Sequence, residues 1–259
     1  MPSPATRKRM RIVSLAPSVT SILVALGARN LLVGVSKWCA DVADVGRLPR
    51  LGDCWSNDAD AVMKLRPDVV IGSVPFKTET VEKLLALPVA FVALNPRSLA
   101  DMESDIRLLG RIAGRSASAE KLIRSVRREF AAISARARRR KTRPKIYCEA
   151  WPNPRITSPP WVRELAEIAG AQMVLQPGSR VTDKQVALAM PDVIVIAWTA
   201  TGDRPSVRKT LENPAWQNVP AVKNRRVIVL RDELLNTPGP PLVEGAKQLF
   251  RAIHAPRRA

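Results

Sequence analysis

The residue types that most often carry chemistry are scarce in this sequence. The only histidine, His254, lies five residues before the end of the sequence, and the three cysteines, Cys39, Cys54 and Cys148, lack the CxxC spacing of zinc and redox sites. Neither the GxxxxGKS/T loop that cradles phosphates nor the GxGxxG turn of dinucleotide sites occurs. We therefore expect no catalytic residue, no protein metal ligand and no intrinsic cofactor, which favours a binding function.

Tryptophan is the residue type that stands out instead. The chain contains 6 Trp against 1 Tyr and 4 Phe. An indole ring can cover the flat face of a large ring-shaped ligand with substantial apolar area. Whether these indoles can meet a ligand depends on the elements that carry them.

The start of the chain reads as a strand, a helix and a second strand. The apolar run over 11–16 predicts a buried strand, and helical spacing of apolar residues follows, with Ser18 as N-cap and Gly27 as the helix end. A second strand is predicted over 31–36. Further helices are predicted over 58–65, 78–87 and 98–113, and further strands over 67–73 and 89–94. This alternation indicates parallel strands.

The second half repeats the same organisation after a long helix. An apolar stripe of Leu122, Val126, Phe130 and Ile133, with Ser118 as N-cap, predicts a helix that ends near Arg139. Strands are then predicted over 145–150, 191–198 and 226–230, and helices over 160–170, 183–190 and 241–254. The domains expected are a basic tail (1–10), an N-terminal α/β lobe (11–115), a connecting helix (116–142) and a C-terminal α/β lobe (143–259).

The formal net charge is +19, with 42 Lys and Arg against 23 Asp and Glu. Much of the excess lies in three segments, 7–11, 136–145 and 256–259. Nucleic-acid binding is the remote alternative, but these segments lack the interleaved aromatic residues on which bases stack. We interpret them as solvated surface.

Four motifs in order resemble one family. "RIVSLAPSVTSILVALG", "LRPDVVIGS", "MPDVIVIAW" and "VPAVKNRRVIVLRDELLNTPGPPLVEGAKQL" are similar to the iron-siderophore/cobalamin substrate-binding proteins of ABC importers, in particular their vitamin B12-binding branch. The resemblance covers about residues 11–254. It implies two Rossmann-like α/β lobes bridged by a single long helix, the class III architecture, with a non-catalytic cleft for a corrinoid or another metal chelate.

The resemblance gives the tryptophans a role at the ends of strands. It implies ligand contacts from Trp38, Cys39 and Trp55 in the first lobe, and from Trp151, Trp161 and Trp198 in the second. Trp216 occupies a position that packs the fold in the family and is left out. Asp232, Glu233 and Arg155 are rim residues that could hydrogen-bond a ligand, although a solvated turn is the simpler interpretation for the two acids.

Family members that dock on an importer carry a glutamate seven residues before the Pro of each Pro-Asp pair. The corresponding positions here are Asp60 and Lys184, which are therefore the candidate permease-docking residues. An acid and a base cannot form the same two salt bridges as two glutamates, so the partnership with a permease departs from the family pattern.

The charged start and the uncharged stretch over 12–28 imitate a signal peptide, but cleavage there would remove the first strand and helix. As written, the sequence predicts a cytoplasmic protein, and a missed upstream start would predict a periplasmic one. We expect a monomer that binds cobalamin or a related corrinoid. The alternative ligands are a ferric siderophore or haem.

Overall fold

A computed structural model describes residues 9–199 and 206–255. The chain forms two compact units. Unit 1 comprises the chain up to Pro96 together with Glu103–Leu122, and unit 2 comprises Arg97–Met102 and the chain from Ile123 on. Of the basic tail predicted over 1–10, only Arg9 and Met10 are among the described residues.

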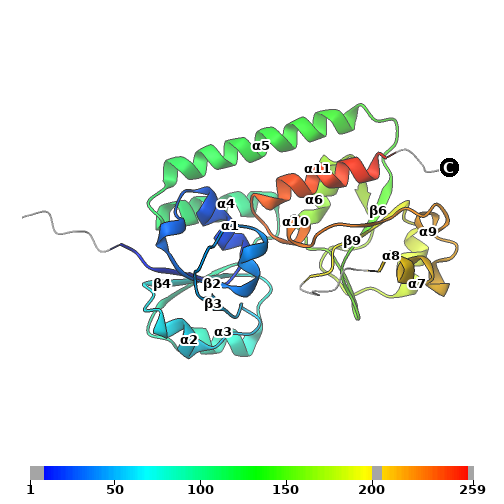
Figure 1. Ribbon diagram of the computed structural model, residues 1–259. Helices are drawn as coiled ribbons and strands as arrows, with labels where there is room; N and C mark the ends of the chain where they lie inside the picture. Colours follow the sequence, from blue (N-terminus) through cyan, green and yellow to red (C-terminus); the bar gives the residue numbers. More distant parts are fainter. Residues whose placement is uncertain (1–8, 200–205, 256–259) are drawn as a thin grey trace, which may run out of the picture. The chain divides into compact units, whose positions relative to one another are not determined.

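Unit 1 is built on a five-stranded sheet with the strand order β3-β2-β1-β4-β5. Its strands are β1 (Ile12–Ser14), β2 (Leu32–Ser36), β3 (Arg50–Leu51), β4 (Val69–Ser73) and β5 (Ala90–Leu94). All the pairings are parallel. Its helices are α1 (Pro17–Ala25), α2 (Ala59–Lys64), α3 (Thr78–Leu85) and the part of α4 (Leu99–Ile112) from Glu103 on. They cover both faces of the sheet, with α1 and α4 opposite α2 and α3 (Figure 1), which is the doubly wound arrangement.

Burial on both faces explains why these strands read as continuous apolar runs. Every residue of β1 and β4 is buried, as is typical of strands inside a parallel sheet. Val13, Val70 and Leu84 form part of one core cluster of this unit. The predicted alternation of helices and parallel strands is confirmed.

The predicted start of α1 is wrong, and its predicted end is confirmed. Pro17 is the first helical residue and Ala16 is the N-cap, without a side-chain hydrogen bond, so Ser18 lies inside the first turn. Proline suits this position because its missing N–H would be unpaired there anyway. At the other end, Gly27 has a φ of +73°, and the Ala28 amide donates to the Leu23 carbonyl at 2.9 Å. This is a Schellman end, which favours glycine.

Unit 2 is built on a second sheet with the order β10-β9-β6-β7, and β8 also pairs with β6. The strands are β6 (Lys145–Pro152), β7 (Arg155–Thr157), β8 (Gln172–Met173), β9 (Val193–Ile196) and β10 (Val227–Val229). β7 is antiparallel to β6, and the other pairings are parallel. The β6–β7 hairpin was not predicted, because the predicted strand ended at residue 150.

The helices of unit 2 are α6 (Trp161–Ile168), α7 (Asp183–Ala189), α8 (Val207–Leu211), α9 (Pro220–Lys223), α10 (Glu233–Asn236) and α11 (Pro241–Ile253). Residues of α7, α8 and α9 pack in one core cluster with Tyr147, Ile194, Ile196 and Trp216. The short helices α8, α9 and α10 were not predicted, because each is too short to show a helical period.

The long helix predicted after unit 1's last strand is α5 (Ser116–Arg138). Its predicted N-cap is wrong, since Ser118 lies within the helix. The residues up to Leu122 belong to unit 1 and the rest to unit 2. Among the described residues, no helix is both long and apolar enough to cross a lipid bilayer.

Candidate functional site

In each unit the candidate tryptophans lie where strands of the sheet end. In unit 1, Trp38 belongs to the 3-10 helix Lys37–Asp41 directly after β2, and Trp55 follows β3. The carboxyl ends of parallel strands lie at one edge of the sheet, and open α/β sheets bind ligands at that edge. The carboxyl edge of unit 1 is therefore a candidate ligand-binding surface.

Trp38 is half-buried and held by two charged neighbours. Its indole Nε1 donates to Oδ2 of Asp53 at 2.9 Å. The Nζ of Lys37 lies 4.6 Å from the centroid of the ring, a cation–π distance. The ring is thus fixed at its N–H edge and covered on one face by an ammonium group.

Trp55 is presented on a tight turn and is 56% exposed. The backbone amides of Trp55 and Ser56 both donate to Oδ1 of Asp53 at 2.9 Å, and the Asp53 amide donates to the Ser56 carbonyl at 3.0 Å. Gly52 is required beside this turn, because a Cβ there would lie 1.8 Å from the Ser56 carbonyl oxygen. Thr80 Oγ1 donates to the Trp55 carbonyl at 2.9 Å, which fixes the turn to α3.

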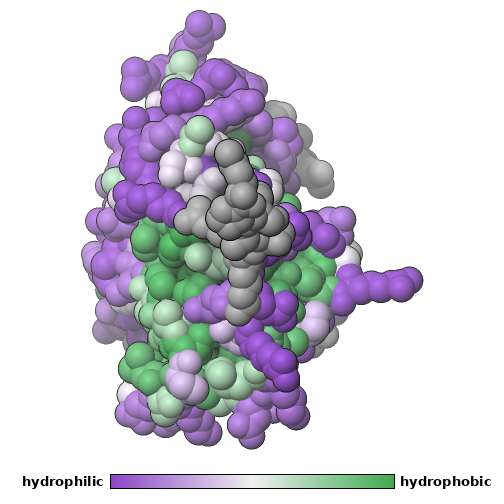
Figure 2. Space-filling view, turned by 90° about the vertical axis from the view of Figure 1, so that its left-hand side faces the viewer, coloured by the Kyte–Doolittle hydropathy of each residue, from purple (hydrophilic) through white to green (hydrophobic). Residues whose placement is uncertain are grey.

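A shallow apolar groove adjoins the Trp55 turn. It is lined by Phe76, Val81, Leu85 and Ala93 among others, and Leu85 is 64% exposed. Figure 2 shows one face of the molecule, on which hydrophobic residues (green) gather. The amide of Lys77, the residue after Phe76, donates to the carbonyl of Cys54, the residue before Trp55, at 3.1 Å. This bond connects the segment that carries Phe76 to the Trp55 turn.

Trp151 and Trp198 lie at the corresponding edge of unit 2. Trp151 is in the last part of β6, is 37% exposed, and donates its Nε1 to the Asn153 carbonyl at 2.9 Å. Trp198 lies two residues beyond the end of β9 and is half-buried. Together with Trp38 and Trp55, we call Trp151 and Trp198 the edge tryptophans.

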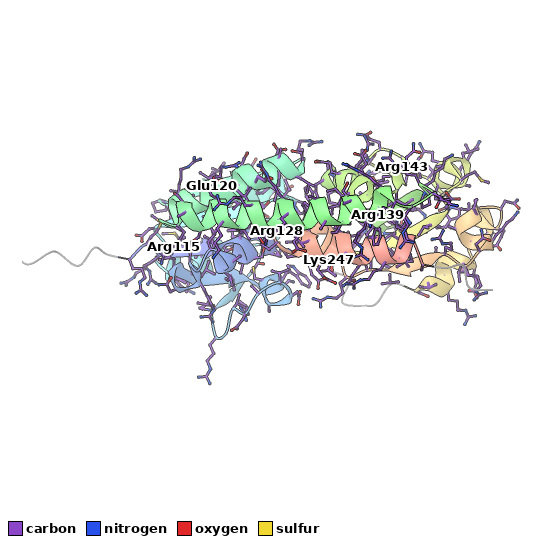
Figure 3. The ribbon with its side chains drawn as sticks, turned by 90° about the horizontal axis from the view of Figure 1, so that it is seen from above. Arg115, Glu120, Arg128, Arg139, Arg143 and Lys247 are labelled. Atoms are coloured by element: carbon purple, nitrogen blue, oxygen red, sulfur yellow. The ribbon has the colours of Figure 1, made fainter. Side chains whose placement is uncertain are left out.

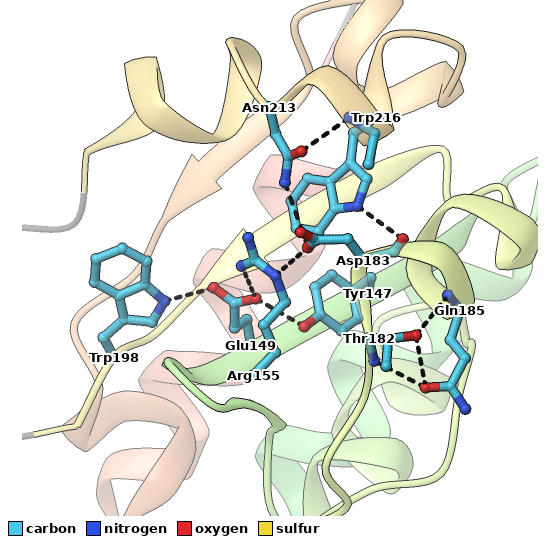
Figure 4. Close-up of polar contacts among 10 residues, drawn as sticks. Tyr147, Glu149, Arg155, Thr182, Asp183, Gln185, Trp198, Asn213 and Trp216 are labelled. Atoms are coloured by element: carbon cyan, nitrogen blue, oxygen red, sulfur yellow. Dashed lines mark hydrogen bonds and ion pairs between the residues drawn. The ribbon is translucent and has the colours of Figure 1, made fainter.

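A buried carboxylate organises the edge of unit 2 (Figure 4). Glu149, on β6, is only 2% exposed. It accepts hydrogen bonds at 2.8 Å from the Tyr147 hydroxyl, from Nη1 of Arg155 and from Nε1 of Trp198. A buried charge is tolerated only when it is paired and hydrogen-bonded, and all three donors converge on this one. Glu149 therefore fixes the Trp198 indole as Asp53 fixes that of Trp38.

Arg155 is neutralised by two acids. Its Nε donates to Oδ1 of Asp183, its Nη1 pairs with Glu149, and its guanidinium carbon lies 4.3 Å from the Trp216 ring centroid. Burial opposes its charge, but the two carboxylates outweigh this effect, so the pKa of Arg155 is above its usual value. Burial and the neighbouring Glu149 also raise the pKa of Tyr147.

Two other predicted ligand contacts are buried in this structure. Cys39 is 0% exposed, and its sulfur lies 3.0 Å from Thr20 Oγ1 and 3.2 Å from Ser36 Oγ. Burial, partly offset by these hydrogen bonds, raises the pKa of its thiol. Trp161 is 2% exposed and donates its Nε1 to the Leu235 carbonyl at 2.8 Å. Neither side chain exposes a surface that a ligand could cover.

The two docking candidates occupy the same position in matching helices. Asp60 is the second residue of α2, after the N-cap Asp58, and Lys184 is the second residue of α7, after the N-cap Thr182. Both are exposed. Their docking role stays a prediction.

The positive charge of α5 is not balanced on that helix. Its two acids are paired, Glu120 with Arg107 at 2.8 Å and Glu129 with Lys247 at 2.7 Å, whereas basic residues such as Arg128 are exposed. Figure 3 labels Glu120 and Arg128 on α5, and Lys247 on α11. α5 carries none of the edge tryptophans.

The sequence matches a known family over most of its length. Residues 12–234 match the family described as periplasmic binding protein. The chain belongs to this family. Its members are the non-catalytic substrate-binding proteins of ABC importers, and the fold is the class III architecture.

Individual relatives are distant. An ABC transporter substrate-binding lipoprotein of Bacillus subtilis is 25% identical over 94% of this chain and 80% of its own length. A vitamin B12-binding protein of Vibrio parahaemolyticus is 24% identical over 89% of this chain and 84% of its own. Among solved structures, a periplasmic heme-binding protein from Pseudomonas aeruginosa is 25% identical, with a TM-score of 0.82, and covers 96% of this chain and 94% of that one. The periplasmic vitamin B12-binding protein of Vibrio cholerae shares the fold, with a TM-score of 0.74, at 22% identity over 94% and 96% of the two chains.

Proposed function

We propose that the protein binds a corrinoid of the cobalamin type on the edge tryptophans, for ABC-type uptake or for carriage within the cell. The proposal rests on two exposed tryptophans, each at the carboxyl edge of its sheet. Trp55 is 56% exposed and Trp151 is 37% exposed. Large exposed aromatic residues at such an edge suit the apolar face of a flat ring.

Among the described residues, none of the usual iron ligands of haem is exposed at these edges. Haem iron is held by His, Tyr, Cys or Met side chains. The single tyrosine, Tyr147, is 0% exposed and bonded to Glu149, and Nε2 of the single histidine, His254, lies 2.9 Å from the Ala169 carbonyl. All three cysteines are buried. The exposed methionines among the described residues, Met10 and Met190, precede β1 and β9 and so belong to the opposite, amino edges. A cobalamin brings its own cobalt ligands and needs none of these.

The charges in unit 2 also favour a neutral corrinoid over an anionic ligand. Arg155 is paired with two acids and Arg231 with Glu233, so neither is a free cation for a carboxylate-bearing ligand. A neutral corrinoid requires no such cation.

The second candidate is an anionic iron chelate, either haem or a ferric siderophore. One observation favours it: Lys37 is exposed and lies over Trp38, where its ammonium could meet an anionic group. The heme-binding relative named above is consistent with this alternative.

Equilibrium dialysis of the purified protein against cyanocobalamin and, separately, hemin tests the proposal. We expect cobalamin binding that Trp55→Ala and Trp151→Ala each weaken by about 10- to 150-fold, which corresponds to the loss of about 1.5–3 kcal/mol of aromatic burial. Leu188→Ala, which truncates a 73% exposed side chain on α7, is the control and should change nothing.

Lys37→Ala separates the two candidates. The variant should weaken binding of an anionic chelate more than binding of cobalamin, because only the anionic chelate loses an ion pair, whereas both lose the contact of Lys37 with Trp38. Absence of cobalamin retention at tens of micromolar protein, or retention that neither tryptophan variant changes, would overturn the corrinoid proposal.

A further inference from the structure

One carboxylate in unit 1, that of Asp53, accepts hydrogen bonds from both Trp38 and Trp55. Oδ2 of Asp53 accepts the Trp38 indole N–H, and Oδ1 accepts the backbone amides of Trp55 and Ser56. Trp38 lies 15 positions before Asp53 in sequence, so this contact joins the loops that follow two different strands.

We propose that Asp53 is a positioning residue that sets the relative orientation of Trp38 and Trp55 for the ligand. This inference rests on the proposed function. Asp53 does not need to touch the ligand, because it acts through the indole N–H of Trp38 and the backbone of Trp55.

The energetic reason is preorganisation. A side chain that is already ordered before binding avoids a cost of about 0.5–1.5 kcal/mol on association, which corresponds to a factor of about 2 to 12 in affinity. Asp53 orders Trp38 directly and Trp55 through the turn. Loss of both effects should weaken binding by about 5- to 150-fold.

Two substitutions at Asp53 separate its two contacts. Asp53→Asn keeps one oxygen and replaces the other by an NH2 group, which cannot accept a hydrogen bond. Whichever way the amide is turned, either the Trp38 N–H or the pair of turn amides faces a donor. Asp53→Ala removes both acceptors. We expect affinity to fall about 2- to 12-fold for the first variant and about 5- to 150-fold for the second.

Asp58→Asn is the matched control. It makes the same charge change five residues later, at the exposed N-cap of α2, where asparagine caps as well as aspartate. The Asp58 side chain accepts from the amides of Asp60 and Ala61. Among the described residues, no hydrogen bond joins it to Trp38 or Trp55. This variant should bind cobalamin like the wild type.

A double-mutant cycle distinguishes positioning from a general structural role. In a Trp38→Phe background the indole N–H is absent, so Asp53→Ala, which removes both acceptors, should cost less affinity than it does in the wild type. Equal losses in both backgrounds would contradict the inference, because the effect of Asp53 would then not pass through Trp38.

The apo protein provides a readout that does not depend on the ligand. The ¹⁵N–¹H signal of the Trp38 indole should move in Asp53→Asn and Asp53→Ala and stay in place in Asp58→Asn. If wild-type protein retains no cobalamin, the proposed function fails, and this signal still tests the Asp53 contact. If wild-type protein binds and both Asp53 variants, folded by circular dichroism, bind equally well, the positioning inference fails and the proposed function stands. Should Asp53→Ala fail to fold, Asp53→Asn decides.

Discussion

Replacing Glu149 should destabilise unit 2 more than replacing any acid on its surface. Its carboxylate is 2% exposed and accepts from Tyr147, Arg155 and Trp198. Glu149→Ala leaves two neutral donors without an acceptor and removes one of the two carboxylates paired with Arg155. Removing one partner of a buried ion pair typically costs about 3–5 kcal/mol, and we expect a loss of that size in the free energy of unfolding.

The assay is urea unfolding at neutral pH, followed by circular dichroism. Glu149→Gln keeps an acceptor oxygen but loses the charge, so we expect a smaller loss of about 1.5–3 kcal/mol, the range for hydrogen bonds to charged groups. Glu212→Ala is the control, because Glu212 pairs with Arg208 on α8 while 59% and 84% of the two side chains are exposed. An exposed pair of this kind is worth about 0.3–0.5 kcal/mol.

The double variant Glu149→Leu with Arg155→Met should recover part of the loss, because replacing both charges by apolar groups leaves no unpaired buried ion. The donors of Tyr147 and Trp198 still lack their acceptor in this variant, so recovery should be incomplete. The remaining partner, Asp183, is 46% exposed and can be solvated. If Glu149→Ala lowered the free energy of unfolding no more than Glu212→Ala does, Glu149 could not be a buried carboxylate that is hydrogen-bonded to three donors.

Three further predictions concern single residues. Gly52→Ala should destabilise unit 1 and shift the Trp55 fluorescence, because its Cβ would collide with the Ser56 carbonyl; unchanged urea midpoint and emission would contradict the turn geometry. Burial lowers the pKa of His254 below 6.5, so its contribution to stability should be complete above pH 6.5 and fall as the pH drops below that value; urea midpoints at pH 7 and 5.5 should differ less in His254→Gln than in the wild type. Lys184→Glu should stabilise α7 by about 0.3–1 kcal/mol, because an acid in the first turn suits the helix dipole better than a base; a lower thermal midpoint in this variant would speak against it.

The fold could be predicted from the sequence largely because its strands are buried on both faces. Such strands appear as short apolar runs, as in β1, β4 and β9, and helical spacing marks the segments between them. The β6–β7 hairpin could not be predicted, because it depends on main-chain pairing and on the contact of Arg155 with Glu149. Neither leaves a local pattern in a segment that contains two prolines.

The edge tryptophans could be proposed from their places at strand ends, but the acids that orient them could not. The contact of Glu149 with Trp198 spans 49 positions in sequence, and only the folded backbone brings the two together. One signal was available: Glu149 is a single acid inside the apolar run of β6, and a buried acid requires partners. Burial of Trp161 likewise follows from the packing of α6 in unit 2, which sequence spacing does not resolve.

The most direct test of ligand binding by the edge tryptophans uses the six indole signals in a ¹⁵N–¹H spectrum. On addition of cyanocobalamin, we predict that the signals of the edge tryptophans move or broaden. Those of Trp161 and Trp216, which are 2% and 1% exposed, should stay in place as internal controls. A spectrum that does not change, or one in which only the two buried indoles respond, would contradict the proposal.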